Sequence, residues 1–213
     1  MQNPDVRNAA LVALASAGAL AALFLVAGEA CGTLFLPLYR FEIEAIFPFV
    51  DIQHLLIDTS GSERLITLQV IFNSPYYVGM NRLAAGTAVS SSTLLGHAFQ
   101  PLVILLPLVG AARAIVPTSK KRLVPGAAFS LVLLTALDVP FVLVGAIEDI
   151  LFNQFAPGNP PSLTMRWLYF LNGGGRWGLS VAAAIVTVAV ASSASVNLNH
   201  KRLSLKPEGL KNE

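Results

Sequence analysis

Charged residues are scarce in this chain of 213 residues, because Asp, Glu, Lys and Arg together make up only 12%. Soluble domains carry about a quarter. Apolar residues make up 54%, the mean hydropathy is +0.66, and much of this apolar content lies in stretches long enough to cross a bilayer. These proportions exclude an ordinary water-soluble protein and indicate an integral membrane protein.

Cysteine, histidine and an excess of one charge are also lacking. The single cysteine, Cys31, excludes an intramolecular disulfide framework. A net charge of +2 from 14 basic and 12 acidic residues lacks the excess of basic residues expected of a nucleic-acid-binding protein. The three histidines, His54, His97 and His200, are too far apart to ligate a metal from one helix face. No phosphate loop or dinucleotide fingerprint is present, so we expect no metal and no cofactor.

Four apolar stretches predict four transmembrane helices. They are residues 9–38, the stretch between Arg82 and Arg113, residues 123–147 and residues 167–199. The second stretch begins with small and polar residues (LAAGTAVSSST), so its upstream boundary is open, and counting about twenty residues back from Ala112 starts that helix near Thr93. A cleaved signal peptide is the weaker alternative for the first stretch, because the apolar run continues past Cys31. We predict an all-α membrane protein with four transmembrane helices.

Lysine and arginine predict the orientation, because they gather in cytoplasmic flanks. With the N-terminus inside, the inner flanks hold Arg7, Arg113, Lys120, Lys121, Arg122, Lys201, Arg202, Lys206 and Lys211, and the outer flanks hold only Arg40, Arg64, Arg82 and Arg166. We therefore expect a multi-pass protein of the cytoplasmic (inner) membrane with both termini cytoplasmic. Its parts are residues 1–39 (N-terminus and first span), 40–82 (external segment), 83–199 (the other three spans) and 200–213 (cytoplasmic tail).

The external segment combines an interfacial helix with a predicted β-hairpin. RFEIEAIFPF extends the first helix along the outer surface until Pro48 ends it. Two runs then flank Thr59–Glu63, and the second run alternates apolar residues on one face. An isolated hairpin is marginally stable, so we expect it to dock on the membrane surface, on the helices or on a partner. We assign partner binding to Ile66, Leu68, Val70 and Phe72, together with Tyr76 and Tyr77 of the aromatic belt.

Ionisable residues inside the predicted spans need a partner or water. Glu29, Asp138 and Arg176 each lie nine residues from the outer end of their span, so all three are about 13 Å deep, with His97 nearer the surface. One interpretation is a structural ion pair between Arg176 and either acid. The other is an outward-facing polar pocket of Glu29, His97, Asp138 and Arg176 in a small transporter, beside Gly173-Gly174-Gly175, where a ligand can approach the backbone.

A third interpretation is catalysis. Cys31 as the nucleophile, His97 as its base and Arg176 as an oxyanion or carboxylate partner contain the parts of an intramembrane cysteine transpeptidase or protease. A buried thiol in apolar surroundings is normally inert, and no spacing rule links the three residues. We therefore rank the enzyme below a non-catalytic role.

The order of features resembles the small exosortase-associated membrane proteins, of the exosortase H type, in bacteria. The shared features are a long first span, a hairpin ending in LQVIFNSPYYVG, a second span soon after it, and a Gly-Gly-Arg start to the last span (Gly174-Gly175-Arg176). The resemblance implies an accessory or assembly subunit in a membrane-bound system that sorts or processes surface proteins. Its expected partners are the lipid bilayer and a membrane protein, for which the resemblance suggests an exosortase-like enzyme.

Overall fold

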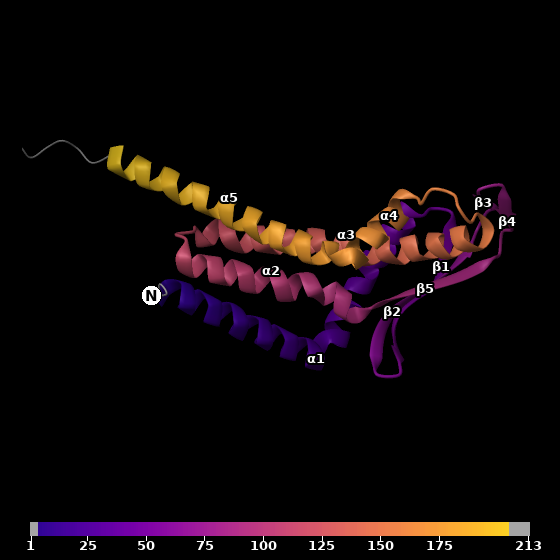
Figure 1. Ribbon diagram of the computed structural model, residues 1–213, viewed down its shortest axis with the longest axis horizontal. Helices are drawn as coiled ribbons and strands as arrows, with labels where there is room; N and C mark the ends of the chain where they lie inside the picture. The colour runs from indigo at the N-terminus through magenta and orange to yellow at the C-terminus, as the bar shows by residue number, and fades with distance from the viewer. Residues whose placement is uncertain (1–3, 205–213) are drawn as a thin grey trace, which may run out of the picture.

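The computed structural model describes the backbone of residues 4–204 and the side chains of residues 6–193. The helices are α1 (Pro4–Ile46), α2 (Leu95–Ile115), α3 (Lys120–Phe155), α4 (Leu163–Phe170) and α5 (Arg176–Ser204), with a short π-helical segment, η1 (Leu171–Gly175), before α5. The strands are β1 (Val50–Ser60), β2 (Glu63–Phe72), β3 (Tyr76–Val78), β4 (Asn81–Leu83) and β5 (Ala88–Leu94). The strands gather at one end of the long helices, opposite the N-terminus and the connection between α2 and α3 (Figure 1).

Four helical stretches in the described part of the chain are long and apolar enough to cross a membrane, as predicted. They are Val6–Ile46, Leu95–Ile115, Lys120–Phe155 and Leu163–Ser193, the last of which runs through α4, η1 and α5. The 21 residues of α2 extend about 31 Å, close to the thickness of a hydrocarbon core. α1 and α3 are much longer, with 43 and 36 residues. Both therefore continue past the level of Leu95, where α2 begins, and pack with the strands.

The predicted hairpin is present and belongs to a larger sheet. β1 and β2 pair antiparallel from Val50↔Phe72 to Ser60↔Glu63, and Gly61, with φ +64°, makes the turn, a conformation that glycine adopts readily. β5 pairs with the other edge of β2, so the order is β1-β2-β5. Residues 88–94, which fell at the uncertain start of the predicted second helix, are therefore a strand, and the helix begins at Leu95.

Alternation explains why the hydroxyl-rich segment of β5 is a strand. Ser91 and Thr93 are buried, whereas Ser90 and Ser92 are exposed, which is the period of two expected for a half-buried strand. The Ser91 hydroxyl donates a hydrogen bond of 2.9 Å to the carbonyl oxygen of Leu143 in α3. One serine thus ties the sheet to the helix behind it.

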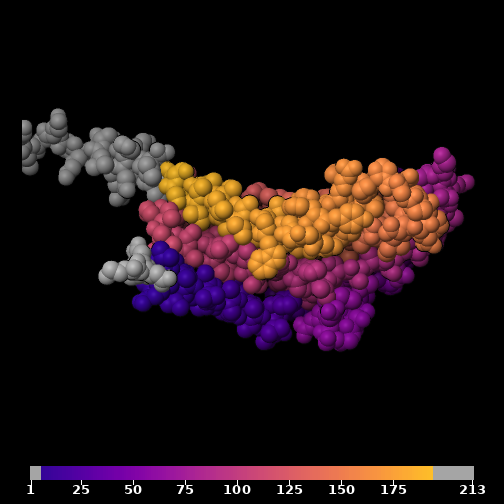
Figure 2. Space-filling view, in the orientation of Figure 1, coloured from indigo at the N-terminus to yellow at the C-terminus, as the bar shows by residue number. Residues whose placement is uncertain are grey.

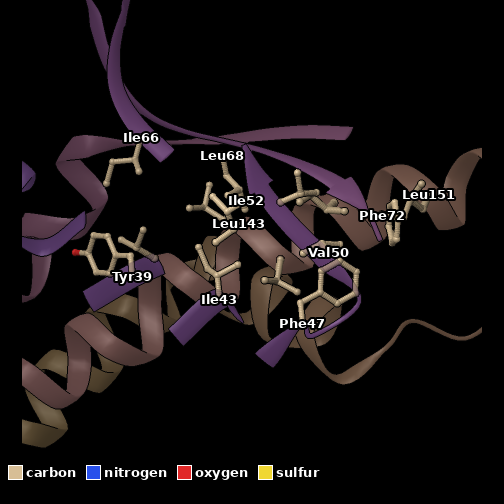
Figure 3. Close-up of a cluster of buried hydrophobic side chains, with 14 of the residues drawn as sticks. Tyr39, Ile43, Phe47, Val50, Ile52, Ile66, Leu68, Phe72, Leu143 and Leu151 are labelled. Atoms are coloured by element: carbon tan, nitrogen blue, oxygen red, sulfur yellow. The ribbon is translucent and has the colours of Figure 1, made fainter. Parts of the chain in front are cut away.

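The inner face of the sheet packs on the ends of α1 and α3 and forms the main core (Figure 3). Tyr39 and Ile43 of α1 lie against it, as does Phe47 directly after the helix, so the predicted interfacial extension is a continuation of α1 that is partly buried under the strands. We call this sheet, with the parts of α1 from Tyr39 and of α3 from Val139, the head.

The head corrects our assignment of a partner surface. Ile66, Leu68, Val70 and Phe72 are each 0% exposed, so none of the four can contact a partner while the chain is folded. Of the three docking sites considered for the hairpin, the structure has it on the helices. Tyr76 is half-buried and stacks on Phe72, with ring centroids 5.0 Å apart; only Tyr77, 65% exposed, lies open at the surface.

Beyond the head, α2, α3 and α5 pack through small and branched residues. This second cluster includes Leu105, Val109, Ala127, Ala184 and Ala191. The hydroxyls of Ser130 and Thr187 lie 3.0 Å apart across α3 and α5. Small residues and hydroxyl pairs at helix contacts are typical of packing within a bilayer.

Candidate functional site

A buried ion pair joins α3 to the start of α5. Arg176 Nε donates to both carboxylate oxygens of Asp138, at 2.8 and 3.0 Å, and the two residues are 4% and 3% exposed. The pairing of Arg176 with an acid is therefore confirmed, and the acid is Asp138. Burial strengthens the attraction but also removes the water that each charge would otherwise bind.

The remaining donors of Arg176 are only partly used. Nη1 donates to the side-chain oxygen of Asn172 at 3.0 Å. Nη2 is buried and has no hydrogen-bond partner among the described residues. An unpaired donor on a buried guanidinium is costly, so this end of the Arg176 side chain is not fully satisfied by the fold.

The helix that carries Arg176 is broken at the glycine run. Gly174 has φ +100° inside η1, and a Cβ at Gly175 would lie 2.6 Å from the carbonyl oxygen of Phe170. A Cβ at Gly173 or Gly174 would meet nothing within 4 Å. Glycine thus permits the break and leaves the backbone open at Gly173 and Gly174. Interrupted helices at membrane depth commonly line ligand sites.

A polar groove of about 440 Å³ lies between the start of α2 and this break. It is lined by His97, Gln100, Leu171, Asn172, Gly174, Arg176 and Trp177. The His97 Nδ1 atom is 3.4 Å from the hydroxyl of Thr93. The predicted polar pocket thus exists in part, with His97 and Arg176 lining it and Asp138 behind Arg176.

Glu29 does not belong to this group. It lies on the exposed face of α1, and its carboxylate makes no ion pair or hydrogen bond among the described residues. The pattern of charges put Glu29 at a similar depth to Asp138 but could not say which way α1 turns. The predicted four-residue pocket is therefore corrected by the removal of Glu29.

Cys31 is also separated from the polar groove. It is half-buried and lines a small apolar cavity of about 70 Å³ with Gly28, Phe99 and Leu102. His97 and Arg176 line the polar groove instead, so the three residues proposed for cysteine catalysis do not form one site. The described residues contain no cluster of three or more potential metal ligands.

Three polar residues at the site and nearby were not predicted from the sequence. Asn172 precedes Arg176 by one helical turn, a spacing that could have suggested the contact. Gln100 lies one turn after His97 and lines the same groove. Glu148 is buried where α3 meets α4, and the hydroxyls of Ser162 and Thr164 donate hydrogen bonds to its carboxylate. These bonds link α3 to the start of α4.

Comparison of the chain with family models, curated proteins and solved structures found no match.

Proposed function

We propose that the protein is an accessory or assembly subunit that binds another membrane protein along α1, in a system that sorts or processes surface proteins. The single observation that carries the binding role is the uncovered face of α1. In the most apolar part of this helix 6% of the residues are buried, against 50% in α3. A helix that is so little packed within its own chain is available to a second one.

A charge on the same face favours a protein partner over lipid alone. Glu29 is flanked on α1 by exposed Leu25 and Val26 on one side and exposed Thr33 on the other. Gly32, less than one turn from Glu29, is so close to Leu95 that a Cβ there would lie 2.8 Å from the Leu95 side chain. Glu29 therefore lies close to the level of Leu95, the first residue of α2. A basic group on a partner helix at this level would offset the cost of a lipid-facing carboxylate.

The basic residues support an orientation with the head outside. Arg7, Arg113, Lys120 and Arg122 belong to the end of the bundle that holds the start of α1 and the α2–α3 connection, away from the sheet (Figure 1). By the positive-inside rule this end is cytoplasmic. The head then projects from the external side of the cytoplasmic membrane, where surface proteins are handled.

The sorting system and an exosortase-like partner rest on the sequence resemblance alone. A transpeptidase or protease receives less support, because Cys31 and His97 line different cavities. A small transporter retains the polar groove but loses Glu29 from it, and Arg176 in the groove is already paired with Asp138.

The test is mild-detergent purification of the tagged full chain from its native host, followed by mass spectrometry of what comes with it. Photo-crosslinking residues at Leu25 and Thr33 should capture the partner, whereas one at Phe129, exposed on α3, serves as the matched control. Glu29→Lys should lower partner recovery, and Glu63→Lys, at the exposed start of β2, should not.

A chain that purifies alone, with crosslinks only to lipid at all three positions, would refute the accessory role. Crosslinks from Phe129 and not from Leu25 would keep a partner but reject α1 as its binding face. Identification of an exosortase-like enzyme in the crosslinked product would support the sorting system, and a different membrane protein would replace it.

A further inference from the structure

The seam between α2 and α5 contains an apolar groove of about 460 Å³. Leu108 and Ala112 of α2 line one side, and residues of α5 between Val181 and Ser192 line the other. Figure 2 shows the face on which α5 lies along α2. Ile185 lines the groove and is 64% exposed, so the groove is open at the surface of the bundle.

The groove lies at the end of the bundle that is opposite the head. Val116, which directly follows α2, lines it. The backbone N–H of Ser119 donates a hydrogen bond of 3.2 Å to the carbonyl oxygen of Ala191 in α5. The connection between α2 and α3 is therefore held against α5 beside the last groove residue, Ser192, and away from the sheet (Figure 1).

The length of the groove matches one leaflet of a bilayer. From Leu108 to Val116 the chain rises about 12 Å, and from Val181 to Ser192 it rises about 16 Å. One leaflet of the hydrocarbon core is about 15 Å deep. An acyl chain of the leaflet next to the α2–α3 connection would fit this length. A transmembrane helix of a partner would instead follow the seam through both leaflets, and the head end of the seam is the polar groove of His97 and Arg176.

The charges at this end of the bundle are all positive in the segments that form the groove and its rim. Arg113, Lys120, Lys121 and Arg122 are exposed, and none of the four has an ion-pair partner among the described residues. The sequence contains no Asp or Glu between Glu63 and Asp138, and α5 contains none. Clusters of basic residues at the end of a membrane helix attract anionic lipid headgroups. The charge here is therefore complementary to an anionic phospholipid.

We propose that the α2–α5 groove binds one anionic phospholipid of the leaflet next to the α2–α3 connection, with an acyl chain along Ala112 and Ala189 and the headgroup at Arg113 and Lys120. Arg113 directly follows Ala112, and Lys120 directly follows Ser119, which is bonded to α5. The site does not depend on the partner proposed for α1, which lies on the other side of α2 from α5 (Figure 1).

The test uses the delipidated full chain in detergent and native mass spectrometry with three probes. Dioleoyl phosphatidylglycerol is anionic, dioleoyl phosphatidylcholine has the same chains with no net charge, and glycerophosphoglycerol has the anionic headgroup without the chains. We expect one phosphatidylglycerol to be retained per chain. Phosphatidylcholine should bind at least about fivefold more weakly, and glycerophosphoglycerol at least about tenfold more weakly.

Matched variants separate the groove from the headgroup site. Ala189→Trp fills the groove and should weaken the binding of both lipids at least about tenfold, whereas Ala182→Trp, exposed on α5 outside the groove, should not. Arg113→Gln and Lys120→Gln should each weaken phosphatidylglycerol binding about fivefold. Arg7→Gln removes an exposed charge from α1 at the same end of the bundle and should leave binding unchanged. Circular dichroism and gel filtration verify that each variant is folded.

Equally tight binding of phosphatidylcholine and phosphatidylglycerol would overturn the anionic headgroup site. Glycerophosphoglycerol that binds as tightly as phosphatidylglycerol, or a folded Ala189→Trp variant that binds both lipids as the parent chain does, would overturn the acyl groove. If Arg7→Gln weakened binding as much as Arg113→Gln and Lys120→Gln, the lipid would respond to the overall charge of this end, and the proposed site would be rejected.

Discussion

The Asp138–Arg176 pair makes the sharpest prediction about stability. The Nε atom of Arg176 lies 2.8 Å from the nearer Asp138 oxygen, and at an effective dielectric constant of about 20 their attraction is about 6 kcal/mol before desolvation. Both side chains are only 4% exposed, so removal of one charge leaves the other buried and unpaired. Asp138→Asn and Arg176→Gln should therefore each lower the free energy of unfolding by about 3–5 kcal/mol.

The double variant should be much less damaging than the sum of the two single changes. Since Asp138→Asn with Arg176→Gln leaves no uncompensated charge, we expect a coupling energy of about 2 kcal/mol or more between the two sites. Reversible unfolding in mixed micelles, followed by tryptophan fluorescence, measures all four chains of the cycle. Trp167 and Trp177 lie close to the pair in sequence and report on this region.

A surface pair in the same chain provides the control. Arg40 and Glu44 form an ion pair of 3.1 Å with about half of each side chain exposed, so its coupling energy should be below about 1 kcal/mol. If the Asp138–Arg176 cycle were additive, or if each single substitution cost less than about 1 kcal/mol, the buried pair would not stabilise the bundle as we argue.

Three further changes test other contacts. Gly175→Ala should lower the thermal unfolding midpoint, because its Cβ would lie 2.6 Å from a backbone carbonyl, whereas Gly178→Ala, in open space on α5, should leave it unchanged or raise it. Ser91→Ala should lower the free energy of unfolding by about 1 kcal/mol through loss of the bond to α3, while exposed Ser90→Ala should change it little; equal effects would reject that bond as a link. Burial, and secondly the carboxylate of Glu148, raise the pKa of Tyr76. The neutral phenol therefore stabilises the fold below a pH of about 10, and this stabilisation is lost as the pH rises further. Tyr76→Phe should reduce the loss of unfolding free energy at alkaline pH, and an unchanged dependence on pH would contradict this.

The four long apolar helices and the hairpin were predictable from the local sequence pattern. Long uncharged runs identify membrane-crossing helices wherever they lie in the fold, and the alternation of Ile66, Leu68, Val70 and Phe72 marks a strand with one buried face. The same pattern could not say what buries that face. We assigned it to a partner, whereas the ends of α1 and α3 cover it.

Strand β5 was missed for a related reason. Its serines and threonine have low hydropathy, and they directly precede α2 without a turn signal, so composition alone attaches them to the helix. Pairing with β2 from Leu65↔Leu94 to Ile71↔Ala88 makes them a strand. Such pairing joins residues well separated along the chain, and a window of local sequence does not contain it.

The sequence by itself determined that this chain has four apolar helices, a hairpin and ionisable residues within the spans, because hydropathy and periodicity depend on neighbouring residues only. The tertiary structure decided which of those residues meet. Rotation of α1 leaves Glu29 on an exposed face and Cys31 in an apolar cavity, while α3 and the broken start of α5 bring Asp138 and Arg176 within 2.8 Å. Depth along a helix can be counted from the sequence, but the direction in which a side chain points depends on how the helices pack.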